Sequence, residues 1–146
     1  MNAVNVKNMI NYTTIEQSKK LLELGLNPES ADMFYCYGMK LDTKEWCYDS
    51  EPTVESKEFH RDICDLPCWS IGTLIDLMPK YMKSGKDYFD LMIIPFYPVV
   101  KYYNESTKTY MESKMGKTLM EAVIKMAERL LECKSTYLKD NPNKMI

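Results

Sequence analysis

The closing segment, residues 117–138, constrains the fold more than any other part of the sequence. Its apolar residues recur at helical spacing: Leu119, Val123, Met126, Leu130, Cys133 and Tyr137. This pattern predicts one long amphipathic helix with a single apolar stripe. No other segment is long enough to cover a sheet, so we expect this helix to be the element that the fold can least do without.

The preceding segment, residues 88–115, predicts the sheet that this helix covers. β-branched and aromatic residues dominate it, and turn residues recur throughout. The expected strands are YFDLMII, VVKYY and TKTYMES, joined by PFYP and NES. We therefore expect an antiparallel meander.

A second helix is predicted at residues 14–24. Thr13 and Thr14 are N-cap candidates, and each is followed three residues later by Glu16 or Gln17. Gly25 stands where a helix often ends in a left-handed residue. The first ten residues show no such pattern, so we expect a flexible tail there.

The middle of the chain predicts short elements. MFYCYGMKL, residues 33–41, alternates as one strand, which would turn at residues 42–44 into a second strand at residues 45–48. Residues 49–58 are polar, which suggests an exposed loop or an edge excursion. A short helix capped by Ser70 should end near Pro79.

Together these elements predict a single α+β domain over residues 1–146. We expect an antiparallel sheet of about four or five strands, packed against an N-terminal, a short central and a long C-terminal helix. A chain of 146 residues with 45% hydrophobic content is large enough to bury one core.

The sequence also predicts a cytoplasmic protein. No apolar run approaches the length that a membrane helix needs, and the first twelve residues lack the apolar core of a secretory signal. Five cysteines are an odd number at irregular spacing, so reduced, buried thiols are the expected state.

Charge is unevenly distributed along the chain. Residues 27–66 carry ten acidic residues and four basic ones, a net charge of −6, whereas the whole chain has −2. One interpretation is a solvated hairpin and loop. The other is a surface that binds a basic protein partner. The near-neutral whole chain favours neither nucleic acid nor anionic lipid.

His60, Cys64 and Cys68 follow one another at intervals of four, which metal ligands on a helix can use. Pro67 opposes a helix there. A strand would spread the three side chains over roughly 26 Å, and a fourth ligand is missing. We therefore expect packing thiols, a surface histidine and no zinc.

Cys68 could instead act as a nucleophile with His60 as its base, because it precedes the Ser70 cap and a helix N-terminus lowers a thiol pKa. Nothing in the sequence orients His60 toward Cys68, and a cysteine beside Trp69 is more typical of core packing. We expect no catalytic residues.

Nucleotide and nucleic-acid sites are weakly indicated. The glycines occur singly, without a phosphate-binding motif, so no cofactor is expected. Lysines interleave with tyrosines in the last third of the chain: Lys101, Lys108, Lys114, Lys117 and Lys125 with Tyr102, Tyr103 and Tyr110. Such a set can bind single strands, but Glu105, Glu112 and Glu121 lie in the same segment and leave it only mildly basic.

Three blocks carry a resemblance: TTIEQSKKLLELGLNPESADM, LPCWSIGTLIDLMPK and GKTLMEAVIKMAERLLE. They resemble small uncharacterised proteins encoded in prophages and conjugative elements of gut Bacteroides-type bacteria, over about residues 9–135. The resemblance implies a mobile-element accessory protein and supplies no activity or site residues. Residues 1–8 precede the usual start of the pattern, so Met9 is an alternative initiator.

Three hypotheses remain open. The preferred one is a non-enzymatic interaction module, in which an aromatic sheet edge and an acidic hairpin within residues 27–66 bind a protein partner. The others are a small enzyme that uses Cys68 or a metal near His60, and a single-stranded nucleic-acid binder. Homo-oligomerisation is compatible with all three.

Overall fold

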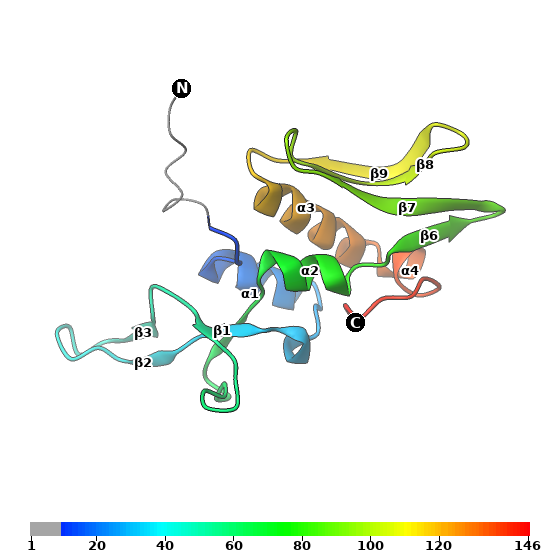
Figure 1. Cartoon of the computed structure of the whole chain (residues 1–146). Helices are drawn as coiled ribbons and strands as arrows, with labels where there is room; N and C mark the ends of the chain where they lie inside the picture. The colour runs from blue at the N-terminus through cyan, green and yellow to red at the C-terminus, as the bar shows by residue number, and fades with distance from the viewer. Residues whose placement is uncertain (1–9) are drawn as a thin grey trace, which may run out of the picture.

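The computed structural model describes residues 10–146 (Figure 1). The predicted tail, apart from Ile10, and the alternative initiator Met9 lie outside the described residues. Over the described range the chain forms four α-helices and a short 3₁₀ helix, η2 (Pro28–Ser30). The α-helices are α1 (Ile15–Glu23), α2 (Ile71–Leu77), α3 (Leu119–Glu132) and α4 (Lys134–Tyr137).

Nine strands form three antiparallel sheets in the same range, which confirms the α+β class. The first sheet has three strands in the order β4-β1-β5: β1 (Met33–Tyr35), β4 (Thr53–Val54) and β5 (Leu66–Cys68). The second sheet is the pair of β2 (Tyr37–Met39) and β3 (Trp46–Tyr48). The third sheet is a meander of β6 (Tyr81–Ser84), β7 (Asp87–Ile94), β8 (Val99–Asn104) and β9 (Thr109–Met115). The prediction of one sheet of four or five strands is confirmed only in part, because one sheet has four strands and the other five strands form two smaller sheets.

The predicted strand over residues 33–41 divides because the backbone changes partners at Cys36. The Cys36 carbonyl accepts a hydrogen bond from the Asp49 N–H at 2.8 Å, and the Tyr37 N–H donates to the Asp65 carboxylate at 2.9 Å. β1 on one side of Cys36 pairs with β4 and β5, whereas β2 on the other side pairs only with β3. The short excursion at β4 confirms an edge element in residues 49–58.

α1 begins and ends as predicted. The Thr14 hydroxyl accepts from the Gln17 N–H, and the Gln17 side chain accepts from the Thr14 N–H, so the capping box is complete. Gly25 follows with φ +99°, a conformation that a side chain would strain. α2 likewise begins after its Ser70 cap.

α3 packs between two layers. One side of it contacts β8 and β9, and it also contacts α1 and α2 (Figure 1). The helix consequently buries more than one stripe: Met120, Ala122, Val123, Ile124, Met126, Ala127, Leu130 and Leu131. Gly116 lies close against α3, since a Cβ at this position would be 2.6 Å from the Ala122 nitrogen. The missing side chain therefore allows α3 to pack in its observed position.

The prediction of one helix over residues 117–138 is wrong at its end. The backbone of Cys133 leaves helical geometry at φ −116° and ψ 45°, and α4 starts anew after it. The Cys133 carbonyl accepts from the Thr136 and Tyr137 N–H groups. This turn brings the Tyr137 hydroxyl to Glu112 on β9, at 2.7 Å.

The core is continuous through these layers and is anchored by hydrogen-bonded aromatic residues. Trp69 is fully buried, and its indole N–H donates to the Ser30 hydroxyl at 3.0 Å. Tyr102, also fully buried, donates to the Pro79 carbonyl at 2.8 Å. A smaller cluster of Tyr35, Leu66 and Cys68 joins the small sheet to α1. Each of these aromatic side chains thus buries its apolar ring and still forms a hydrogen bond through its polar group.

Candidate interaction surface

The β2–β3 hairpin projects from the body of the molecule (Figure 1). Its register pairs Tyr37 with Tyr48 and Met39 with Trp46, so these four side chains share one face of the two-stranded sheet. The Tyr37 ring centroid lies 5.9 Å from that of Trp46 and 4.9 Å from that of Tyr48. The exposed fractions of Met39 and Trp46 are 52% and 60%. We call these four residues the hairpin face.

The tip of the hairpin extends the apolar surface. Leu41 is 95% exposed. A polar residue at this turn position would lose no packing contacts, so the fold itself does not require leucine there. Lys44 adopts φ +57°, and the Lys40 N–H donates to the Glu45 carbonyl, which closes the turn. On the opposite face, Lys40 forms an ion pair with Asp49.

Exposure of so many apolar side chains on a two-stranded sheet is energetically unfavourable for an isolated chain. Two strands alone are marginally stable in water. Within the described structure Tyr48 packs against the cluster of Tyr35, Leu66 and Cys68, whereas Tyr37, Met39 and Trp46 stay exposed. Clustered, exposed aromatic residues are typical of interaction sites. Of the fifteen large hydrophobic residues that are exposed in the described part of the chain, seven lie within residues 27–66: Tyr37, Met39, Leu41, Trp46, Val54, Phe59 and Ile63. The exposed apolar surface is thus concentrated in the acidic window.

Carboxylates surround this apolar surface. Asp42 and Glu45 are exposed beside the tip, and Glu51 and Glu58 are exposed farther along the window. Two of the four basic residues are already engaged, Lys40 with Asp49 and Arg61 with Glu29. Among residues 10–146, the four exposed carboxylates have no ion-pair partner. The net negative charge of the window is therefore available to an outside partner.

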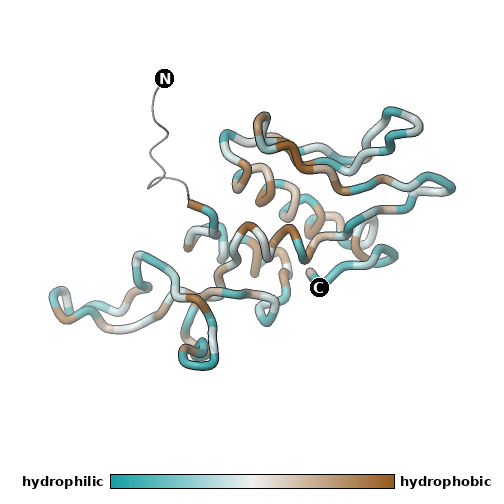
Figure 2. The backbone as a smooth tube through the Cα atoms, viewed as in Figure 1, coloured by the Kyte–Doolittle hydropathy of each residue, from teal (hydrophilic) through white to brown (hydrophobic). Residues whose placement is uncertain are grey.

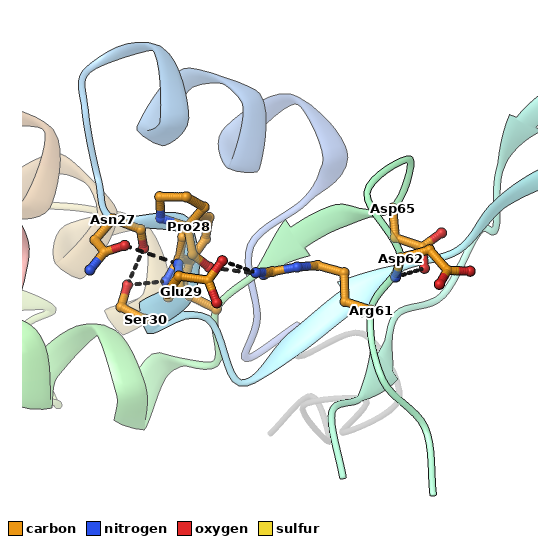
Figure 3. A network of polar contacts seen from close by, with 8 residues as sticks. Asn27, Pro28, Glu29, Ser30, Arg61, Asp62 and Asp65 are labelled. Carbon is orange, nitrogen blue, oxygen red and sulfur yellow. Dashed lines mark hydrogen bonds and ion pairs between the residues drawn. The ribbon is translucent and has the colours of Figure 1, made fainter. Parts of the chain in front are cut away.

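A polar network fixes the base of this region (Figure 3). Arg61 donates to the Pro28 carbonyl at 2.8 Å and to the Glu29 carboxylate at 3.1 Å, which ties the loop before β5 to η2. Asp65 accepts from the N–H groups of Asp62 and Tyr37, each at 2.9 Å. The same carboxylate therefore holds both its own loop and the first residue of β2. Local sequence patterns do not indicate this network because its hydrogen bonds join residues up to 33 positions apart.

The structure separates the three residues of the predicted metal or catalytic cluster. His60 and Cys64 lie exposed on the loop between β4 and β5, whereas Cys68 is fully buried in β5. No three histidine, cysteine or carboxylate side chains within residues 10–146 are grouped to hold a metal ion.

The surroundings of Cys68 oppose the alternative in which a helix N-terminus activates its thiol. Burial raises the pKa of its thiol, and the hydrogen bonds from Thr13 and Tyr35 oppose this only in part. The Cys68 Sγ donates to the Thr13 carbonyl at 3.3 Å. A buried thiol with a raised pKa is a poor nucleophile at neutral pH.

The lysine and tyrosine set does not form one face. Tyr102 points into the core, Lys125 pairs with Glu121, and Lys114 approaches Glu112 on the side of the sheet that faces α3. Lys101 lies over the ring of Tyr103 at 4.5 Å, on the other side. The structure thus divides the predicted nucleic-acid set between two sides of the sheet.

Comparisons with protein-family models, with curated proteins and with solved structures found no match to this chain. Across residues 10–146, no helix combines the length and the apolar character needed to cross a bilayer.

Proposed function

We propose that this chain is a non-enzymatic interaction module that binds a basic protein partner through the hairpin face and the carboxylates around it. The single observation that carries the proposal is the hairpin face, on which Tyr37, Met39 and Trp46 are exposed within a window of net charge −6. Its setting is the cytoplasm, and its biological context is that of a mobile-element accessory protein.

Two physical arguments support this assignment. Aromatic residues and methionine are enriched at protein interfaces, because they bury large areas at a small loss of side-chain entropy. Carboxylates at the rim attract a partner of opposite charge and speed its encounter. The partner surface that fits is therefore apolar at its centre, where it covers Trp46 and Met39, and rich in lysine or arginine at its rim.

The hydrogen bonds of Arg61 and Asp65 also support the proposal, because they restrain the base of the hairpin. Asp65 holds the first residue of β2 on the loop before β5, and Arg61 ties that loop to η2, so the hairpin face projects from a fixed base. A contact surface held in one conformation loses less entropy on binding than a free loop does.

Zero-length carbodiimide crosslinking in the host cell extract tests the proposal, because it joins carboxylates to lysines in direct contact. We expect wild-type chain to capture a protein whose lysines are linked to Asp42 or Glu45. Trp46→Ala should lose that protein, and high salt should weaken its capture. Tyr97→Ala, an equally aromatic exposed position outside the window, is the matched control and should retain it. Equal capture by Trp46→Ala, or crosslinks confined to other carboxylates, would reject the proposal.

A further inference from the structure

The four-stranded sheet has a second face that α3 does not cover. α3 lies along one side of β6–β9, and the described helices leave the other side open (Figure 1). In β8, Val100 and Tyr102 point inward and are buried, while Lys101 and Tyr103 alternate with them on the open side. The strand register continues this side as a row from Tyr81 through Asp90 and Tyr103 to Tyr110. We call this the outer sheet face.

The outer sheet face is rich in aromatic and apolar groups. Tyr88 and Tyr110 are 51% and 62% exposed, and the rings of Tyr81 and Tyr88 lie 5.8 Å apart. In the hydrophobic half of β7 (Figure 2), Leu91 and Ile93 pack on the core, so Met92 and Ile94 lie on the outer side, and the loop that follows carries Phe96, which is 95% exposed. A patch of this kind marks a contact site on a soluble domain.

One pair of charges on the face is self-complementary. Asp90 lies opposite Tyr103, and Lys101 lies opposite Met92 on the same pair of strands. Asp90 and Lys101 are therefore diagonal neighbours with opposite charges near the centre of the face. A two-fold axis between them would place Asp90 of each copy against Lys101 of the other.

We infer that the outer sheet face binds a second copy of this chain in a two-fold, sheet-on-sheet dimer. An isologous contact needs a patch that is complementary to itself, and the Asp90–Lys101 diagonal has this property. Inner faces of stacked sheets pack about 10 Å apart through interdigitated side chains, and tyrosines and branched aliphatic groups suit that spacing.

The size of the face is compatible with such a dimer. Four strands about 4.8 Å apart and six residues of about 3.3 Å each span a projected area of roughly 400 Å². The solvent-accessible area of the face is larger than this projected area, because side chains protrude from the sheet and the β7–β8 loop adds Phe96 and Tyr97. Standard interfaces begin at about 600 Å² for each partner, so the dimer contact needs the loop residues as well as the strands.

The same features disfavour single-stranded nucleic acid on this face. Asp90 lies in the middle of the tyrosine row, where its carboxylate would repel a phosphate backbone. Lys83 and Lys101 lie over the rings of Tyr88 and Tyr103, at 5.6 Å and 4.5 Å, and so cover surfaces on which bases would stack.

Sedimentation equilibrium of the full chain with charge-swapped variants tests the dimer. We expect wild type to reach twice the 17.1 kDa chain mass at concentrations up to about 100 μM. Asp90→Lys and Lys101→Glu should each weaken association at least about 100-fold, because each places like charges in contact. An equimolar mixture of the two variants should dimerise again, since every cross-contact then joins opposite charges.

The controls separate this inference from the proposed function. Trp46→Ala should lose partner capture and keep the dimer mass, because the hairpin face and the outer sheet face lie on different sheets. A wild-type mass that stays at one chain, or variants that dimerise like wild type, would overturn the inference. Binding of a labelled oligothymidine to the single chain, abolished by Tyr110→Ala, would overturn it in favour of nucleic acid.

Discussion

The hydroxyl group of Tyr137 donates a hydrogen bond to a carboxylate oxygen of Glu112 across 2.7 Å, and thereby joins the last helical turn to β9. Arg129 of α3 donates to the other oxygen at 3.2 Å. One carboxylate thus connects the sheet, α3 and α4. The break at Cys133 is what allows this arrangement, because it redirects the chain after α3.

Tyr137→Phe should lower the free energy of unfolding by about 1 to 2 kcal/mol, since it removes a hydrogen bond to a charged group at a mostly buried position. Urea titration measures the change. Tyr97→Phe, at an exposed loop position, is the matched control and should be neutral. Equal stabilities of the two variants would mean that the contact contributes nothing.

Leu130→Ala should lower the free energy of unfolding by roughly 2 to 5 kcal/mol, because it opens a cavity at a fully buried site between the sheet and the helices. Glu132→Ala, on the exposed side of the same helix, should change it by less than about 0.5 kcal/mol. A harmless Leu130→Ala in the same urea series would contradict the packing of α3 described above.

Arg61→Gln should loosen the loop before β5 without unfolding the core, because it weakens the contacts to Pro28 and Glu29. Hydrogen exchange of residues 55–65 should accelerate about fivefold, which corresponds to a local loss of about 1 kcal/mol. Exchange in α3 should stay unchanged. Lys57→Gln removes a positive charge from the same loop and serves as the control.

Iodoacetamide should label Cys64 first and Cys68 last. Cys64 is exposed, whereas burial both blocks access to Cys68 and raises the pKa of its thiol. Peptide mass spectrometry of the folded chain measures the order of labelling. Raising the pH toward 9 should leave Cys68 the slowest, and rapid labelling of Cys68 at neutral pH would revive a catalytic role for it.

Glu121→Gln should lower stability near neutral pH and have no effect in acid. The Lys117 N–H and then the Lys125 side chain hold the pKa of the Glu121 carboxyl below its ordinary value. A lowered folded pKa contributes stability that is present above the unfolded pKa, about 4.3, and is lost as the pH falls through the folded value. In urea titrations of both chains at pH 7 and at lower pH values, the difference in stability should therefore be largest at pH 7 and shrink as the pH falls.

The parts of the fold that follow from local signals could be predicted from the sequence. The Thr14 capping box, the Ser70 cap and the Gly25 terminus are each contained within a few residues, and the structure confirms all three. The strands of β7, β8 and β9 were likewise indicated by composition and turn spacing. β6 was missed because only Met82 of its four residues is buried, which leaves almost no alternation to recognise.

The candidate surface depends on distant contacts and could be predicted only in part. The turn at residues 42–44 and the acidic window are readable along the chain. The division at Cys36 is not, because it arises from Asp49 and Asp65, and neither residue has a local signal for that role. Alternation also cannot tell a covered face from an open one, so the exposure of Trp46 and Tyr110 became apparent only from the structure.

The position of α3 between two layers has a consequence for the chain as it leaves the ribosome. Synthesis proceeds from the N-terminus, so α1, α2 and the four-stranded sheet emerge before the helix that separates them. The sides of α1, α2 and the sheet that pack on α3 lack this cover until α3 itself has been made. The two early helices wait longest for it, and this interval is when a chaperone would be needed.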